Sequence, residues 1–245
     1  MKLFEVQYIL LRPFLLPLHN QVHHELKSII KGYGSLKPKL LDIGGRKSHY
    51  TIGLHADVTI TDLPRESSVQ QQLHLGINDE IIRKTLERRS NIEQIIFDNM
   101  EETSLPDQTF DIAVAVEVLE HVEKDADFIH NVYRVLKPGG VFFMTTPNGD
   151  YITVVTNPDH KRHYRHRELV HKLSRCFDEV EVYYAVSGGR FHKWGLKSWS
   201  ITHPLSTTIS AISNVVNRWE SSRPSVKKQA YGTHHLMAVA KKPLE

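Results

Sequence analysis

Apolar runs of about four to seven residues recur along the chain, separated by polar and glycine-containing stretches. Runs without the alternation of a half-exposed sheet predict parallel strands that are buried on both faces. The predicted strands cover residues 39–43, 57–62, 92–97, 110–116, 141–146, 177–184 and 233–240. Apolar positions at helical spacing predict helices over 20–31, 77–89, 126–136 and 167–176. The pattern is typical of an α/β, Rossmann-like protein with a mostly parallel sheet and helices on both faces.

The N-terminal residues 1–36 are predicted to form an arm and a helix ahead of the main domain, 37–245. Residues 3–18 are apolar, but Arg12, Pro13 and Pro17 interrupt them, so they fit neither a membrane span nor a signal peptide. Two interpretations remain. The favoured one is an arm that packs on its own domain or on the second subunit of a homodimer. The other is a peripheral membrane contact near a lipid-linked substrate.

Composition narrows the classes of function. A net charge of +3 is too small to indicate nucleic-acid binding. The single cysteine, Cys176, can form neither an internal disulfide nor a thiolate metal site, so a cytoplasmic location is the simplest expectation. The histidines and carboxylates show no recognisable ligand spacing, so no metal site is expected.

Candidate ligand-binding residues follow the predicted strands, because ligands of open α/β sheets bind outside the carboxyl ends of the strands. Gly44 and Gly45 follow the first strand, where glycine lets a ligand approach the backbone closely. Asp62 ends the second strand and can accept both ribose hydroxyls of a nucleoside. Asp98 ends the third, and Met100 supplies a polarisable apolar contact.

The fourth strand continues into Glu117-Val118-Leu119-Glu120-His121-Val122. It is preceded by Leu105-Pro106 and followed by Leu136-Lys137-Pro138-Gly139-Gly140. Together these blocks resemble the core of class I S-adenosylmethionine-dependent methyltransferases, in the branch of quinone-biosynthesis and sugar-modifying enzymes. The resemblance spans about residues 40–182. It implies seven strands with an antiparallel last strand, and it makes 187–232 an insertion between strands six and seven.

The resemblance also implies a cofactor, S-adenosylmethionine, with S-adenosylhomocysteine as product. The expected cofactor-binding residues are Asp42, Gly44, Gly45, Asp62, Leu63, Asp98, Asn99, Met100 and Glu117. Arg46 stands where the family has a second glycine, and this departure leaves the strength of cofactor binding open.

Residues 159–164 are similar to the segment that closes over the acceptor in sugar-type methyltransferases. By this likeness His160, Arg162 and Tyr164 are expected to contact the substrate. His121 and His163 are candidate catalytic bases, because an imidazole titrates near neutral pH. The insertion 187–232, with Trp194, Trp199 and Trp219, is a candidate lid or oligomer interface.

The leading functional hypothesis is a methyltransferase for a small-molecule or glycan acceptor, acting on a sugar hydroxyl. Alternatives are a lipid-linked or quinone-like acceptor and a non-catalytic binding or regulatory protein on the same fold, which Arg46 would favour. A nicotinamide-dependent dehydrogenase is disfavoured by the incomplete glycine pattern. No nucleic-acid partner is expected.

Overall fold

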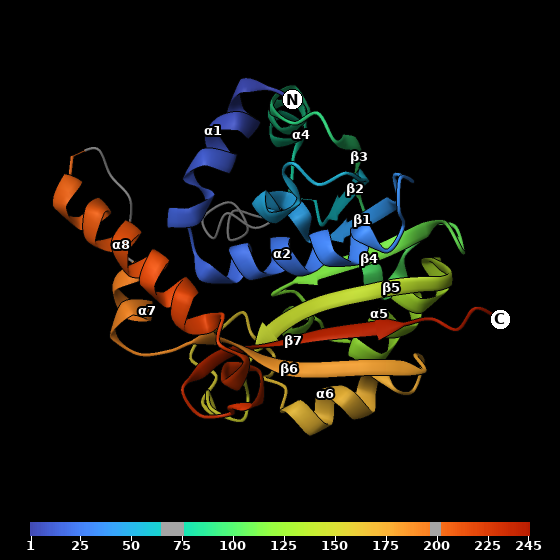
Figure 1. Cartoon of the computed structure of the whole chain (residues 1–245). Coiled ribbons are helices and arrows are strands. Elements are labelled where there is room, and N and C mark those ends of the chain that lie inside the picture. Colours follow the sequence, from blue (N-terminus) through green and yellow to red (C-terminus); the bar gives the residue numbers. More distant parts are fainter. Residues whose placement is uncertain (65–75, 197–201) are drawn as a thin grey trace.

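A computed structural model describes residues 1–64, 76–196 and 202–245. Its centre is a seven-stranded sheet with the order β3-β2-β1-β4-β5-β7-β6 (Figure 1). The strands are β1 (Lys39–Ile43), β2 (Asp57–Asp62), β3 (Ile92–Phe97), β4 (Phe110–Val116), β5 (Leu136–Pro147), β6 (Glu179–Ser187) and β7 (Thr233–Lys241). β7 runs antiparallel to β5 and β6, while the pairs among β1 to β5 are parallel. The predicted α/β fold with an antiparallel last strand is confirmed.

Helices cover both faces of this sheet (Figure 1). The α-helices are α1 (Leu3–Leu11), α2 (Pro17–Lys31), α4 (Asp79–Arg88), α5 (Asp125–Val135), α6 (His166–Leu173), α7 (Arg190–Gly195) and α8 (Pro204–Ser221). Short 3₁₀ turns are η1 (Arg12–Phe14), η2 (Gly45–Lys47), η3 (His49–Thr51), η4 (Met100–Glu102), η5 (Leu119–His121) and η6 (Pro224–Lys228). α2 begins before the predicted residue 20 because Pro17 is tolerated in the first turn of a helix.

The central strand β4 has consecutive apolar residues from Ile112 to Val116 because each face of the sheet carries its own core. In β4, Ile112 and Val114 belong to the core under α2, whereas Ala113 and Ala115 belong to the core under α5 and α6. In β5, Phe143 joins the first core. This alternation follows from the two-residue period of a strand, so the unbroken apolar runs of the sequence were a correct signal.

β5 differs from its prediction because it begins five residues earlier, at Leu136 rather than at Val141. Its register with β4 jumps between the pairs Phe110–Leu136 and Ile112–Val141, so residues 137–140 form a bulge. Gly139 in this bulge has a φ of +73°. Both ends of the bulge bond to the C-terminal segment: the amide of Gly139 donates to the carbonyl of Pro243, and that of Lys242 donates to Gly140.

The N-terminal arm packs on its own domain. Val22, Leu26 and Ile30 of α2 lie in one core of the sheet. In the arm ahead of α2, the buried carboxylate of Glu5 accepts hydrogen bonds from the backbone and hydroxyl groups of Ser90. Arg12 donates to the carbonyl oxygen of Ile52, which ties the arm to the segment between β1 and β2.

The insertion 187–232 folds mainly as α7 and α8, and α8 packs on the arm. The side-chain amide of Asn214 in α8 donates to the carbonyl of Phe14, and Gln21 of α2 donates to Ser221. Trp199, one of the three tryptophans noted in this insertion, lies outside the described residues.

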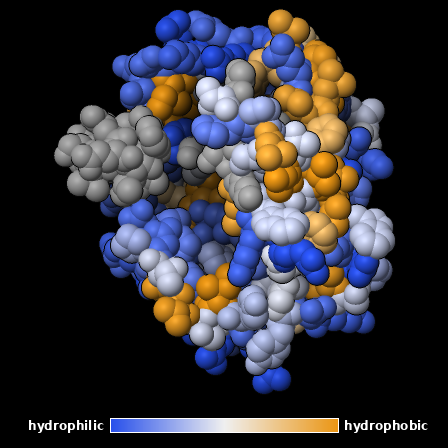
Figure 2. Space-filling model, turned by 90° about the vertical axis from the view of Figure 1, so that its left-hand side faces the viewer, coloured by the Kyte–Doolittle hydropathy of each residue, from blue (hydrophilic) through white to orange (hydrophobic). Residues whose placement is uncertain are grey.

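The carboxyl ends of the parallel strands form one edge of the sheet, and this edge points toward the viewer in Figure 2. Large apolar side chains are exposed in the N-terminal arm and in α8; they include Leu3, Leu10, Leu11, Phe14, Leu205, Ile212 and Trp219. Among the described residues, no helix has the length and apolar character needed to cross a membrane.

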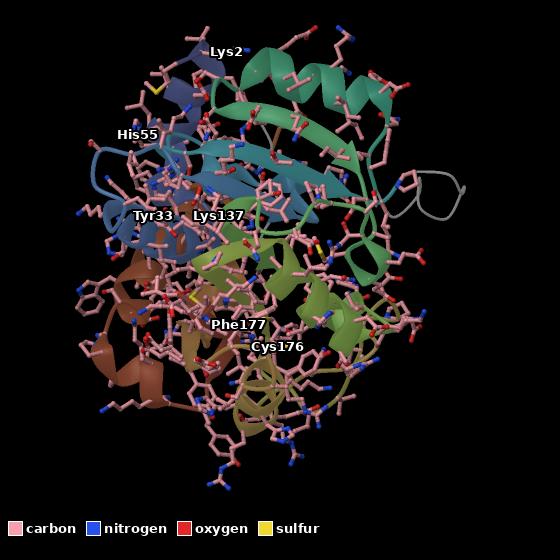
Figure 3. All side chains as sticks on the ribbon, turned by 90° about the vertical axis from the view of Figure 1, so that its right-hand side faces the viewer. Lys2, Tyr33, His55, Lys137, Cys176 and Phe177 are labelled. Atoms are coloured by element: carbon pink, nitrogen blue, oxygen red, sulfur yellow. The ribbon has the colours of Figure 1, made fainter. Side chains whose placement is uncertain are left out.

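Figure 3 shows the opposite edge, where the labelled Tyr33, His55, Lys137 and Phe177 lie at or just before the beginnings of strands. Cys176 lies on that edge as well.

Replacing Phe143 with alanine should lower the free energy of unfolding by about 3–5 kcal/mol, because the ring is fully buried and its removal leaves a cavity. Urea unfolding at neutral pH measures this loss. Phe97→Ala is the control: its ring is 45% exposed at the edge strand β3, so we expect a clearly smaller loss. Equal losses in the two variants would contradict the described core.

Candidate active site

Two cavities lie along the carboxyl edge of the sheet and share one residue, Glu117. The larger has a volume of about 430 Å³ and is lined by residues that follow β1, β2, β3 and β4. The smaller has a volume of about 350 Å³ and lies toward β5, β6 and β7. We call them the cofactor cavity and the acceptor cavity, after the roles that the sequence predicts for their residues.

Most of the predicted cofactor residues line the cofactor cavity: Gly44, Asp62, Leu63, Asp98, Asn99, Met100 and Glu117. Asp42 and Gly45 do not. Asp42 is fully buried beneath the turn, where the hydroxyl of Tyr50 donates to its Oδ1 atom at 2.8 Å. A Cβ atom on Gly45 would lie 2.5 Å from the Asp42 carboxylate. These two residues therefore shape the turn from below rather than face a ligand.

The turn after β1 requires glycine at position 44. Gly44 has a φ of +67°, and a Cβ atom there would lie 2.8 Å from a methyl group of Val118. Arg46, the departure from the family pattern, lines the cavity. The cavity is therefore open beside Arg46, so this arginine does not fill the space next to the turn.

Carboxylates at the ends of β2 and β3 face the cofactor cavity. Asp62 accepts a hydrogen bond from the amide of Leu63 at 2.8 Å. Asp98 accepts one from the hydroxyl of Thr103 at 2.7 Å, while its second oxygen is buried with no partner among the described residues. Burial raises the pKa of Asp98 above its ordinary value.

Apolar residues, histidines and three further polar residues, Glu117, Thr156 and Asn157, line the acceptor cavity. The apolar residues are Leu16, Pro17, Leu18, Pro147, Ile152, Val186 and Leu196, and the histidines are His160, His163, His192, His234 and His235. The rings of His192 and His234 stack with centroids 3.9 Å apart. Burial lowers the pKa of each to about 4, so both are neutral at pH 7. His192 and His234 therefore add no positive charge to the cavity at pH 7.

Glu117 stands between the two cavities in a strained backbone conformation. Its φ is +54°, which is uncommon for a residue with a side chain and is often found at functional sites. The hydroxyl of Thr145 donates to its Oε1 atom at 2.8 Å, and Nδ1 of His235 lies 3.1 Å from Oε2. Burial raises the pKa of Glu117, but His235 and these hydrogen bonds outweigh it, so the pKa lies below its usual value.

Three histidines at the junction are linked to each other or to backbone carbonyls. His121 and His163 each place Nδ1 near a carbonyl oxygen, that of Asp159 at 3.0 Å and that of Ile152 at 2.8 Å. A carbonyl only accepts, so both Nδ1 atoms carry the proton. Nε2 of His163 lies 2.9 Å from Nδ1 of His160, so these two ring nitrogens share a hydrogen bond. The hydrogen bonds of His121 and His160 thus use their Nδ1 atoms, which leaves the Nε2 side of each ring toward the junction.

Two predicted substrate residues, Arg162 and Tyr164, do not line the acceptor cavity. Tyr164 is fully buried, and its hydroxyl donates to Asp125 at 2.8 Å. Arg162 donates to the same carboxylate at 3.0 Å, and neither side chain lines the acceptor cavity. They fix the segment that carries His160 and His163 to α5. The similarity of residues 159–164 to a substrate-closing segment did not reveal which side chains point inward.

Sequence reasoning missed several residues of the site. Glu120 is fully buried, and the hydroxyl of Thr146 donates to its Oε2 atom at 3.1 Å. Burial, together with the charge of Glu117, raises the pKa of Glu120 well above its ordinary value. Gly76, which lines the cofactor cavity, has a φ of +66°. The histidines of β7 and α7 carried no motif, although the density of histidines in the chain was a weak signal.

The buried carboxyl of Asp42 should make stability depend on pH. Burial raises its pKa to about 6 from an ordinary 3.8, so between these values the folded protein holds a proton that the unfolded chain has released. Its contribution to the free energy of unfolding therefore falls as the pH rises from about 4 to about 6, by roughly 2–3 kcal/mol, and is constant above that range. Urea unfolding across this range should show a flatter profile for Asp42→Asn. The exposed Asp178→Asn is the control, and identical profiles for wild type and Asp42→Asn would contradict the assignment.

Comparison with known proteins agrees with this geometry. Residues 41–144 match the family model described as a methyltransferase domain. A "probable S-adenosylmethionine-dependent methyltransferase" of Mycolicibacterium smegmatis is 36% identical over 122 residues, which are 48% of this chain and 46% of that protein. A mitochondrial ubiquinone biosynthesis O-methyltransferase of Bos taurus is 35% identical over 114 residues, 45% of this chain and 29% of that protein. The chain thus spans less than half the length of these two curated relatives.

A solved structure, a SAM-dependent methyltransferase from Archaeoglobus fulgidus, shares the fold. It superimposes with a TM-score of 0.57 at 18% identity and covers 91% of this chain and 94% of that one. The family match contains the residues that follow β1 to β4, which form most of the cofactor cavity. Residues 41–144 are therefore similar to a methyltransferase domain, and the chain shares the fold of a SAM-dependent methyltransferase.

Proposed function

We propose that the protein transfers a methyl group from S-adenosylmethionine to a hydroxyl of an apolar, quinone-precursor-like acceptor. The observation that carries this proposal is the apolar, histidine-lined cavity that meets the cofactor cavity at Glu117. An acceptor in the smaller cavity would point toward a donor in the larger one. The name of the Bos taurus relative, a ubiquinone biosynthesis O-methyltransferase, agrees with this class of acceptor.

Methyl transfer to a hydroxyl requires that the acceptor oxygen be aligned with the methyl carbon and that a group nearby accept the hydroxyl proton. The sulfonium donor carries its own activation, so the protein mainly holds the acceptor oxygen in line with the methyl carbon and excludes water. Burial and the neighbouring His121 and His163 lower the pKa of His160, so this ring is in its neutral, proton-accepting form at pH 7. The Nε2 atoms of His121 and His160 face the junction from which a hydroxyl proton must leave. His163 supports His160 rather than acting as the base.

A sugar hydroxyl, the first hypothesis from the sequence, now ranks second. Its support was the similarity of residues 159–164 to sugar-type enzymes, and two of the three expected contacts, Arg162 and Tyr164, are held by Asp125. The exposed lining of the acceptor cavity is largely apolar, whereas a sugar needs several hydrogen-bonding partners. A phenolic ring fits such a cavity better than a pyranose does.

Asp62→Ala should weaken binding of S-adenosylmethionine by at least about tenfold, because a carboxylate that accepts from two ribose hydroxyls makes charge-assisted bonds worth roughly 1.5–3 kcal/mol each. Calorimetric titration with S-adenosylmethionine and S-adenosylhomocysteine measures the change, with NAD as the negative ligand. Asp127→Ala, at an exposed position of α5, is the matched control. Unchanged affinity in Asp62→Ala would remove the ribose role.

Leu18→Asp should raise the KM for an apolar phenolic acceptor by roughly tenfold or more, because Leu18 lines the acceptor cavity and a carboxylate there disfavours an apolar ring. Cofactor affinity should stay unchanged. Mass spectrometry of products from deuterated S-adenosylmethionine, with catechols, monophenols and methyl glycosides as acceptors, measures the transfer. Leu205→Asp, at an exposed site of α8, is the control. Transfer only to glycosides would overturn the proposed acceptor class.

A further inference from the structure

A third cavity lies apart from the two of the candidate active site, on the face of the sheet that carries α2. Its volume is about 1190 Å³, and none of its described lining residues also lines the cofactor cavity or the acceptor cavity. We propose that this cavity binds an amphipathic organic anion, a small dissolved molecule with an apolar body and a carboxylate or phosphate group. We call it the anion cavity.

The floor of the anion cavity is the sheet itself, and helices form its sides (Figure 1). Tyr183 and Ala185 of β6 and Met237 of β7 line it, and all three belong to the core under α2. α8 packs on α2 and on β6, and the turn η6 also packs on β6. The cavity therefore occupies the part of this sheet face that lies between α2 and the end of the insertion.

The anion cavity concentrates positive charge. Four side chains that are cationic at pH 7 line it: Arg12, Arg218, Arg223 and Lys227. Glu25 is the one acidic residue among its described lining residues, so the excess of three positive charges equals the formal net charge of the whole chain. In the described part of the chain, only Lys227 of these four has an ion-pair partner, Glu25 at 3.5 Å. Neighbouring cations without counterions repel each other, and a bound anion would remove that repulsion.

Aromatic rings hold two of these cations in place. The guanidinium of Arg223 lies 4.3 Å from the centre of the Trp219 ring, and the ammonium of Lys227 lies 4.1 Å from that of Tyr183. Trp219 is 64% exposed whereas Tyr183 is 6% exposed, so one pair lies at the mouth of the cavity and the other at its floor. A ring face attracts a cation without neutralising its charge. The charged groups are thus positioned before an anion binds.

Buried polar atoms beside the cavity also indicate a polar ligand. Nε of Arg12 and Oε1 of Gln21 are buried and have no hydrogen-bond partner among the described residues, and both side chains line the cavity. Their other polar groups are engaged, because Arg12 donates to the carbonyl of Ile52 at 2.6 Å and Gln21 donates to that of Ser221 at 3.2 Å. Buried polar groups are nearly always hydrogen-bonded, so these two atoms favour a bound group with both donors and acceptors.

The rest of the lining selects an apolar body for the anion. Val215, Val216 and Met237 offer apolar contacts, which favour burial of an apolar surface. The planar guanidinium of an arginine pairs with two oxygens of a carboxylate or a phosphate. An inorganic anion would leave the apolar wall uncovered, and a neutral apolar molecule would leave the cations unpaired. The ligand therefore needs both parts.

Four dissolved probes test this requirement by calorimetry. 1-Naphthoate and 1-naphthyl phosphate carry both an apolar ring and an anionic group, 1-naphthylmethanol lacks the charge, and inorganic phosphate lacks the apolar body. We expect one site per chain for at least one of the two naphthyl anions. The alcohol and inorganic phosphate should each bind at least about tenfold more weakly. Affinity for the anion should also fall as the salt concentration rises, because salt screens the attraction.

Charge-reversal variants locate the site. Arg218→Glu and Arg223→Glu should each weaken binding of the naphthyl anion by at least about tenfold, because each replaces an attractive charge with a repulsive one. Arg175→Glu makes the same charge change at an exposed position just after α6 and is the matched control. Leu18→Asp alters the acceptor cavity and should leave this affinity unchanged.

The outcomes separate the anion cavity from the candidate active site. Weaker binding in the Arg218 and Arg223 variants, with normal binding in both controls, supports the proposal. Loss of binding in Leu18→Asp alone would place the probes in the acceptor cavity and overturn it, as would equal affinity for the alcohol or no binding of either anion at millimolar concentration. Arg223 is exposed, so its variant keeps the test valid if Arg218→Glu fails to fold.

Discussion

The register between β4, β5 and β7 is the constraint on which the site depends. Val116 pairs with Thr145, and Pro147 pairs with His235, so the residues just beyond β4 meet the ends of two other strands. Through these pairings Glu117 reaches Thr145 and His235, and Glu120 reaches Thr146. The apolar residues of β4, buried on both faces, fix that register, because a slip by one residue would exchange the two cores. The geometry of the junction is thus set by core packing.

The sequence was sufficient for the sheet and for most of the cofactor cavity. Continuous apolar strands, and the rule that ligands bind beyond their carboxyl ends, placed Gly44, Asp62 and Asp98 along one edge. The assignments of Asp42 and Gly45 followed the same rule, but Asp42 points beneath the turn, where Tyr50 bonds to it. A motif specifies a backbone turn more reliably than it specifies which side chains face the ligand.

The acceptor cavity was far less predictable, because its walls come from distant segments that only tertiary packing brings together. Leu18 of α2, His192 of α7 and His234 of β7 share that cavity without sharing a motif. The same reason hid Glu120, whose burial depends on Thr146 above it. The side chains of the basic run at 160–163 divide: His160 and His163 line the acceptor cavity, while Arg162 pairs with Asp125.

The family match ends at residue 144, and this boundary separates the two cavities. Of the described residues that line the cofactor cavity, all except His19 fall within the match, whereas the described residues of the acceptor cavity other than Glu117 fall outside it. Selection can therefore remodel the acceptor walls in the arm, the insertion and β7 while the donor machinery is inherited unchanged. A change of acceptor among descendants of such a chain needs no compensating change in cofactor recognition. Glu117 is the exception among the described residues, because its side chain lines both cavities.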